Sequence, residues 1–410
     1  MAFQKEEAGM PWKDTSAMDE RYEFVRAAKT DLGSFTERCA RYGISTKTGY
    51  KWMHRYEREG IHGLDNQSRA PKNHPNQVSI KIREAILEAR RAHATWGPKK
   101  LRNHLLQNNP RLSWPVLSTI GEIIKSNGLS IHRRRRRRTP PCTQPFSDCN
   151  AANRVWCADY KGWFNTQDGH RCDPLTITDG FSRYLLRCQI VESLSYEVAR
   201  GVFETAFYEY GLPVAIRTDN GIPFASRGVA GLSRLSVWWI RLGIQPERIK
   251  PGNPQQNGRH ERMHLTLKQE TTIPPARNLR AQQRRFDDFR QEYNDVRPHE
   301  AIDMKTPASL YQPSPRCYPS RLPDLEYDSG LEVRLIGSRG EFYWKRNKIF
   351  LTEVLQGERI GLQRCEDRYW RVYFGTLSLG IFDSLKLKLL SARQIRRFEE
   401  AFAQGMEYDD

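Results

Sequence analysis

Residues 155–160 read Val-Trp-Cys-Ala-Asp-Tyr, and residues 216–221 read Ile-Arg-Thr-Asp-Asn-Gly. Each stretch is typical of a short buried strand, and each includes an aspartate, Asp159 or Asp219, at the end of that strand. The 59 residues between the two aspartates leave room for a hairpin and a helical crossover, so the two strands can be neighbours in one sheet. Both carboxylates are then expected at the same sheet edge.

The residues around these two stretches predict a mixed α/β sheet. Strands are expected over 155–160, 175–178, 183–191, 214–218 and 244–249. Helices are expected over 196–210, 232–242 and 259–270, and glycines follow the first two of them. Three strands in a meander followed by alternating helices and strands indicate this mixed class.

A third acidic residue, Glu261, lies on the last of these helices and can close over the same sheet edge. Three convergent carboxylates cannot all stay ionised without a cation, and oxygen ligands of this kind suit Mg²⁺ or Mn²⁺. Two such ions per active site can activate an attacking oxygen and stabilise a leaving one in phosphoryl displacement. We therefore predict that Asp159, Asp219 and Glu261 are catalytic and hold metal. Singly, each also fits a plain structural role, as a turn former or a surface residue.

Glu261 also belongs to a second motif, because residues 260–264 read His-Glu-Arg-Met-His. HExxH on a helix is the pattern of zinc metalloproteases, and its histidines at i and i+4 share one helix face. The pattern fixes only three residues and lacks a convincing third ligand in this chain. A structural or DNA-contacting role for the two histidines is the favoured interpretation, and a metalloprotease is the remote alternative.

The N-terminal region predicts a helix-turn-helix. Short helices are expected over 23–29 and 34–42, Gly43 makes a tight turn, and Ser45 caps a third helix over 46–58. Basic residues recur every four positions on that third helix, so they share a face that can enter a major groove. A solvated basic face on a structural helix is the alternative.

A second helical unit follows, with helices expected over 80–91, 98–107 and 119–127, the last of them capped by Ser118. Six consecutive arginines come directly after it, and such a run is suited to following phosphates or entering a minor groove. The predicted DNA-binding residues are Lys47, Thr48, Lys51, Arg55, Arg133, Arg134, Arg135, Arg136, Arg137, Arg138, Arg259 and Lys268.

Composition supports a nucleic-acid partner. The 410 residues carry a formal net charge of +18, and such an excess of cations is most often matched by phosphate. No apolar run is long enough for a transmembrane helix, and the N-terminus lacks a secretory signal, so a cytoplasmic, nucleoid-associated protein without a membrane partner is expected. The eight cysteines form no CxxC pair, which predicts neither a zinc finger nor a disulfide framework.

Three motifs in order resemble the catalytic signature of bacterial insertion-sequence transposases with a retroviral-integrase-type core. They are residues 155–160, residues 218–221, and Pro-Gly-Asn-Pro-Gln-Gln-Asn-Gly-Arg-His-Glu-Arg at 251–262. Residues 293–301, Tyr-Asn-Asp-Val-Arg-Pro-His-Glu-Ala, and Thr-Pro-Ala at 306–308 resemble the usual ending of that core. One departure is the gap of 41 residues between Asp219 and Glu261, longer than is common in the family, with the extra residues placed at 226–231.

The resemblance implies a ribonuclease-H-like core, a D-D-E metal site, and action on double-stranded DNA as a homo-oligomer that pairs transposon ends and joins them to target DNA. A DNA-binding regulator with an inactive core is the main alternative. The expected multidomain arrangement begins with a helix-turn-helix at 20–66, a second helix-turn-helix or winged-helix-like unit at 78–132, and an Arg- and Pro-rich linker at 133–150. It continues with the catalytic core at 151–311, a Pro-rich linker around 312–325, an SH3-like β-barrel at 328–390 and a helix at 392–404.

Overall fold

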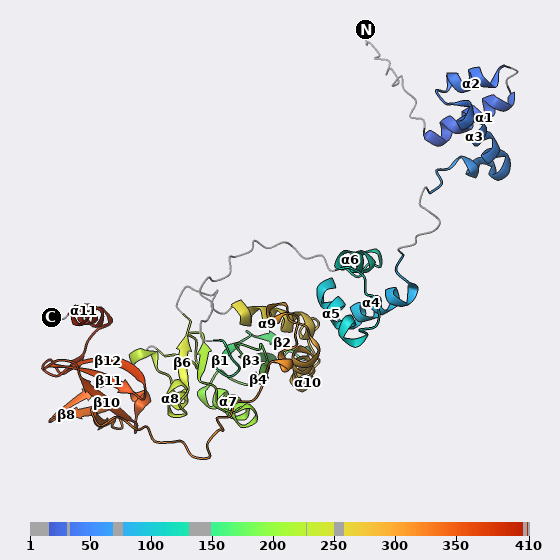
Figure 1. Cartoon of the computed structure of the whole chain (residues 1–410). Coiled ribbons are helices and arrows are strands. Elements are labelled where there is room, and N and C mark those ends of the chain that lie inside the picture. Colours follow the sequence, from blue (N-terminus) through green and yellow to red (C-terminus); the bar gives the residue numbers. More distant parts are fainter. Residues whose placement is uncertain are drawn as a thin grey trace, which may run out of the picture. The chain divides into compact units, whose positions relative to one another are not determined.

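The computed structural model describes residues 16–30, 33–68, 77–130, 149–226, 228–249, 258–404 and 408 (Figure 1). The chain divides into two compact units, residues 1–77 and residues 78–410. The arginine run at 133–138 lies outside the described residues, as does the side chain of Arg259.

The first unit is a three-helix bundle. Its helices are α1 (Ala17–Thr30), α2 (Phe35–Arg41) and α3 (Thr46–Glu59), followed by the 3₁₀ turn η1 (Gly60–Leu64). The Ser45 hydroxyl accepts from the Thr48 N–H, which confirms the predicted cap of α3. Helix α1 begins earlier than predicted, because Ser16 and Asp19 cap its first turn reciprocally.

Close approach of α2 and α3 depends on Gly49. A Cβ there would lie 2.6 Å from the Cys39 sulfur. The small core of this unit contains Phe24, Val25, Cys39, Trp52 and Leu64.

A second helical bundle begins the other unit. It contains α4 (Ile80–Ala92), α5 (Pro98–Asn108) and α6 (Leu117–Ser126), packed around Trp96 and Trp114. The prediction that Ser118 caps the last helix is wrong. The Val116 carbonyl already accepts from the Ile120 N–H, so α6 starts at Leu117 and Ser118 lies inside it.

The centre of this unit is a six-stranded mixed sheet. Its strands are β1 (Val155–Tyr160), β2 (Phe164–Asn165), β3 (Arg171–Asp179), β4 (Leu185–Val191), β5 (Ala215–Thr218) and β6 (Gln245–Arg248). The order is β2-β3-β1-β5-β6, and β4 also pairs with β3. β1 pairs antiparallel with β3 and parallel with β5, and β5 pairs parallel with β6. The predicted mixed sheet is confirmed, with β2 as an unpredicted addition.

Helices cover both faces of the sheet. Trp156, Leu175 and Ile216 point from one face into a core shared with α7 (Tyr196–Tyr210) and α8 (Arg234–Arg241). Cys172 and Cys188 lie in the other core, with residues of α9 (Gly258–Thr271) and α10 (Leu279–Gln291). Side chains alternate between the faces along β1 and β3, so the parity of a residue in these two strands decides which helices it meets.

The Pro-rich stretch at 312–325 has no helix or strand, but it is fastened to the core. Arg316 donates to the carbonyls of Pro213, Leu242 and Gly243 at 2.7, 2.9 and 3.0 Å. The Ser314 N–H donates to the Tyr210 carbonyl at 2.8 Å. This segment therefore binds along the core instead of acting as a free tether.

The C-terminal part is rich in β-structure, as expected. A five-stranded antiparallel sheet has the order β13-β12-β11-β10-β7, and β8 pairs with β9 in a hairpin. The bounds are β7 (Glu332–Leu335), β8 (Glu341–Trp344), β9 (Asn347–Phe350), β10 (Arg359–Arg364), β11 (Tyr369–Phe374), β12 (Leu377–Asp383) and β13 (Lys388–Leu389), followed by α11 (Ala392–Ala403). Closure into an SH3-like barrel stays a prediction. The apolar core of this part includes Val237 and Ile240 of α8, which fixes it to the central sheet.

Candidate catalytic site

Asp159 lies near the carboxyl end of β1, on the sheet face that α9 covers. Trp156 and Ala158 point to the opposite core, so Cys157 and Asp159 alternate onto the α9 face. Thr176 of β3 is paired directly with Asp159 in the antiparallel register, and its side chain therefore lies on the same face. Asp159 itself is half-buried.

Asp219 follows β5 at the neighbouring position. Val155 pairs with Ala215 and Cys157 with Arg217, so two further steps along both strands reach Asp159 and Asp219. The predicted adjacency of the two strands is confirmed.

The loop that follows β5 holds the Asp219 carboxylate in place. Its Oδ1 accepts from the Gly221 N–H at 3.1 Å, and a Cβ on Gly221 would lie 3.1 Å from Oδ2. Asn220 fastens the same loop by donating to the Ile249 carbonyl at 2.9 Å. The Asp-Asn-Gly sequence thus forms the turn after β5 and also fixes the orientation of the Asp219 carboxylate.

Helix α9 brings its HExxH motif to this face of the sheet. The Nε2 atoms of His260 and His264 lie 2.6 and 2.8 Å from the Thr176 hydroxyl, which donates to the Asp159 carbonyl at 3.0 Å. A threonine hydroxyl has one proton, so the two imidazoles must donate to its lone pairs. Both rings then carry their proton on Nε2 and a lone pair on Nδ1.

Burial keeps both histidines neutral. It lowers the pKa of His260 to about 3 and that of His264 to about 2. One ring nitrogen of each and an Asp159 oxygen all lie within 4.8 Å of one another. Among the described residues, Asp159, His260 and His264 therefore form a cluster of side chains that could hold a metal ion.

Glu261 occupies the first turn of α9 and is exposed. The neighbouring His260 contacts Thr176 and so fixes this end of α9 against β3. Glu261 itself does not belong to the cluster of Asp159, His260 and His264. Residues 250–257, which lead into α9, are outside the described residues. The three-carboxylate site therefore stays a prediction, in which Asp159 and Asp219 come from the neighbouring parallel strands β1 and β5.

Cations gather beside this sheet edge. Lys268 is exposed on α9, and Lys161 lies just beyond β1. The pKa of Lys161 is lowered first by its own partial burial and then by the positive charge of Lys268. Sequence reasoning singled out Lys268 and missed Lys161. Its position two residues after Asp159 is a signal that would have found it.

In the first unit, the predicted basic face of α3 is only partly exposed. Lys47 and Lys51 are exposed and Thr48 is half-buried. Arg55 is turned toward its own unit, because it lies 4.9 Å from the Trp52 ring centroid and donates to the Asp65 carbonyl at 3.1 Å. Tyr50 is exposed on the same helix and was not predicted, although the i, i+3, i+4 spacing from Lys47 places it there.

The second helical bundle is joined to the helices around the site. Arg297 pairs with Glu270 of α9 at 2.6 Å, and the Thr95 hydroxyl donates to the same carboxylate. His93 lies 2.8 Å from Glu292 and stacks on Trp96. The far end of the Glu261 helix is thus tied to the loop between α4 and α5.

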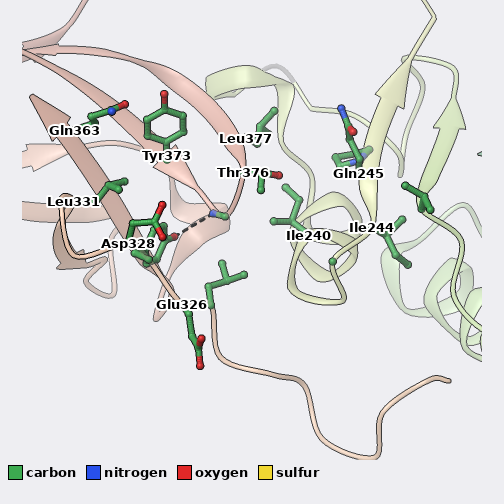
Figure 2. A pocket seen from close by; sticks show the side chains of 16 residues that line it. Ile240, Ile244, Gln245, Glu326, Asp328, Leu331, Gln363, Tyr373, Thr376 and Leu377 are labelled. Carbon is green, nitrogen blue, oxygen red and sulfur yellow. Dashed lines mark hydrogen bonds between the residues drawn. The ribbon is translucent and has the colours of Figure 1, made fainter. Parts of the chain in front are cut away.

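A cavity of about 680 Å³ lies between the central sheet and the C-terminal sheet. Figure 2 shows Gln363 and Tyr373 on one side and Ile240, Ile244 and Gln245 on the other. Glu326 and Asp328 line it, and no lysine or arginine does, so its walls do not suit nucleic acid.

Comparison with known families is consistent with this geometry. The integrase core domain family matches residues 150–254 and again residues 242–307, a span that includes both aspartates and α9. An uncharacterized protein of insertion element IS407 from Burkholderia multivorans is 29% identical over 200 residues, covering 47% of this chain and 67% of the relative. A protein of insertion element IS476 from Xanthomonas euvesicatoria is 24% identical, covering 58% of this chain and 66% of the relative.

The chain carries an integrase core at residues 150–307, and it is similar to proteins of bacterial insertion elements. The resemblance drawn from residues 155–160, 218–221 and 251–262 is confirmed. Because the integrase family models also cover α9, the HExxH motif lies within this integrase core. The matches span about two thirds of the length of these relatives.

The chain also matches two further domain families, both of the helix-turn-helix type. A helix-turn-helix domain covers residues 20–72, and a homeodomain-like domain covers residues 48–124. The magnesium-bound catalytic core of HTLV-2 integrase is 16% identical and covers 40% of this chain and 99% of its own length, but its TM-score of 0.33 supports no argument. Across the described part of the chain, none of the helices is long and apolar enough to cross a bilayer.

Proposed function

We propose that this protein is a DDE transposase that binds transposon end repeats, cleaves DNA at those ends and joins the exposed 3′-hydroxyl to target DNA. The observation that carries the proposal is the parallel pairing of β1 with β5 within an integrase core, in which the paired residues Cys157 and Arg217 lie two positions before Asp159 and Asp219. The strand order, with three antiparallel strands followed by two parallel ones, supports a ribonuclease-H-like core.

The donor set fits divalent magnesium or manganese. Asp159, Asp219 and Glu261 would hold two ions with carboxylate oxygens, the ligands that Mg²⁺ prefers. When bound, the ions supply a polarised attacking oxygen and neutralise charge on the leaving oxygen. A half-buried Asp159 and Asp219 and an exposed Glu261 leave this set open to a DNA backbone.

The chain's own groups orient the DNA. Lys161 and Lys268 lie beside the sheet edge and suit phosphate oxygens on either side of the cleaved bond. In the first step water attacks the phosphorus and the strand's 3′-oxygen leaves with a proton. In the second step that 3′-hydroxyl attacks a target phosphodiester and displaces a target oxygen, so one phosphodiester replaces another and no ATP is consumed.

End recognition is assigned to the two N-terminal helical units, with Lys47, Thr48 and Lys51 of α3 toward the major groove. The arginine run at 133–138 would follow phosphates between these units and the core. Pairing of two ends requires at least two copies of the chain, so we propose a homo-oligomer on double-stranded DNA. The protein would act on nucleoid DNA in the cytoplasm.

The test is incubation of the full chain with a panel of candidate repeat ends and target DNA in Mg²⁺, reading nicked and joined products on a denaturing gel. Joined products that depend on one end sequence support the proposal. Specific end binding in a mobility-shift assay without nicking or joining would assign the chain to DNA-binding regulators with an inactive core.

A further inference from the structure

The two histidines of the HExxH motif take no part in the proposed phosphoryl transfer. They lie on one face of α9, with ring centroids 4.6 Å apart, and both face a strand pair that carries an aspartate. We propose that Asp159, His260 and His264 form a binding site for a divalent transition-metal ion such as Zn²⁺ or Co²⁺, distinct from the three-carboxylate site. We call it the imidazole site.

The ligand set selects the class of ion. Two imidazoles and one carboxylate suit Zn²⁺, Co²⁺ or Ni²⁺, whereas Mg²⁺ favours oxygen ligands alone. Ligand atoms within 4.8 Å of one another are already close to the spacing of roughly 3.4 Å that a tetrahedral ion with bonds of about 2.0–2.2 Å requires.

Threonine hydroxyls orient both imidazoles, as the outer partners of metal ligands do. The Thr176 hydroxyl lies 2.6 and 2.8 Å from Nε2 of His260 and His264. The Thr178 hydroxyl lies 3.2 Å from Nδ1 of His260. In the described part of the chain, no hydrogen bond engages Nδ1 of His264.

Three protein ligands leave a fourth position open for water or a phosphate oxygen. The site shares Asp159 with the proposed catalytic set, so an ion held by the histidines would draw that carboxylate away from Mg²⁺. Zn²⁺ is therefore expected to inhibit the enzyme. Only this consequence rests on the proposed function, and the binding itself does not.

Binding is tested with the full chain stripped by a chelator and titrated with Co²⁺, whose visible absorption reports nitrogen ligation. We expect one Co²⁺ per chain that depends on the imidazole site and is displaced by Zn²⁺. His264→Gln is expected to weaken that site by at least about 100-fold, and Thr176→Val by roughly 10–100-fold. His264→Cys should instead add a cobalt–thiolate charge-transfer band at one Co²⁺ per chain, which the native thiols of the wild type do not give under the same conditions.

Glu261→Gln and Asp219→Asn are the matched controls, because neither residue belongs to the imidazole site. They are expected to leave the Co²⁺ spectrum and stoichiometry unchanged. An unchanged spectrum in His264→Gln together with no new band in His264→Cys would overturn the proposal. Loss of the signal in Glu261→Gln or Asp219→Asn would place the ion in the carboxylate site and overturn it as well.

Inhibition is measured separately, by adding Zn²⁺ to joining reactions in Mg²⁺. Joining by the wild type is expected to fall at Zn²⁺ concentrations that saturate the Co²⁺-competing site, and His264→Gln is expected to need at least about 100-fold more Zn²⁺ for the same loss. A chain that joins no DNA but binds Co²⁺ as described would contradict the proposed function and leave the imidazole site standing.

Discussion

Asp159 in β1 and Asp219, the residue directly after the parallel neighbour β5, each lie two residues beyond the paired residues Cys157 and Arg217. Because side chains alternate along a strand, this equal spacing favours the same sheet face for both carboxylates. This relationship turns two aspartates separated by 59 residues into one candidate site.

The Thr176 hydroxyl is expected to stabilise the folded chain, because it links the histidines of α9 to the strand that carries Asp159. Thr176→Val keeps the volume and removes the partner of both Nε2 atoms, leaving buried donors unsatisfied at a cost of about 1–3 kcal/mol. Urea denaturation measures the loss. Thr176→Ser keeps the hydroxyl and is the control. Equal stability of the valine and serine variants would show that the hydrogen bonds contribute nothing.

The pair of Glu270 and Arg297 is expected to hold α9 to the segment that follows α10. Their side chains are 17% and 7% exposed, so removal of one partner leaves a poorly solvated charge. Glu270→Ala is predicted to cost about 3–5 kcal/mol of unfolding free energy. The double variant Glu270→Leu, Arg297→Met should recover much of it. A double variant as unstable as the single one would rule out the pair as the cause.

Stability should fall in acid partly through His299. Burial, together with Lys100 and Arg297, lowers its pKa to about 3, although it donates to the Tyr293 carbonyl. In the unfolded chain a histidine titrates near roughly 6.5. As pH falls from that value toward 3, only the unfolded state takes up this proton, so stability is lost by about 1.4 kcal/mol per pH unit.

Denaturant titrations between pH 7 and pH 5 measure this slope. His299→Gln should reduce the slope of unfolding free energy against pH by the amount that one proton contributes. His54→Gln, at a side chain that is 75% exposed, should leave it unchanged. The same slope in wild type and His299→Gln would mean that His299 protonates in the folded chain.

The exposed part of α3 is expected to carry end binding. Lys51→Ala should weaken binding to every sequence and reduce the slope of log K against log salt by about 0.9, since one phosphate contact is lost. Arg55→Ala should change that slope less, because the Arg55 guanidinium is half-buried and donates to the Asp65 carbonyl. Fluorescence anisotropy over a salt series gives both slopes. A larger change for Arg55 would place the wrong face toward DNA.

Local signals predicted much of the fold. The strand ending at Asp159, helix α7 and the Ser45 cap follow from periodicity and capping within single segments. Helix α10 escaped prediction because its 13 residues are strongly polar and bury few side chains, chiefly Phe286 and Phe289. Its stability comes from docking on β4, which the sequence of α10 does not encode alone.

The adjacency of the strands that lead to Asp159 and Asp219 was predictable, and the surroundings of Asp159 were not. Strands β1 and β5 pair in parallel, as their topology predicts, while the catalytic role of the two aspartates stays a prediction. The contact of Thr176 with His260 and His264 joins residues 84 and 88 positions apart, and only tertiary packing determines such a pairing. The Glu261 assignment still depends on its motif.

The most direct test of the proposed chemistry is joining of a cognate end to target DNA by Asp219→Asn in Mg²⁺, measured beside a mobility shift with the same end. Asparagine keeps the shape and the Gly221 contact but removes the charge that would hold metal. We predict that cleavage and joining fall by at least about 1,000-fold, or roughly 4 kcal/mol of transition-state stabilisation, while end binding stays within a few-fold of wild type. Joining retained at the wild-type rate would contradict the assignment.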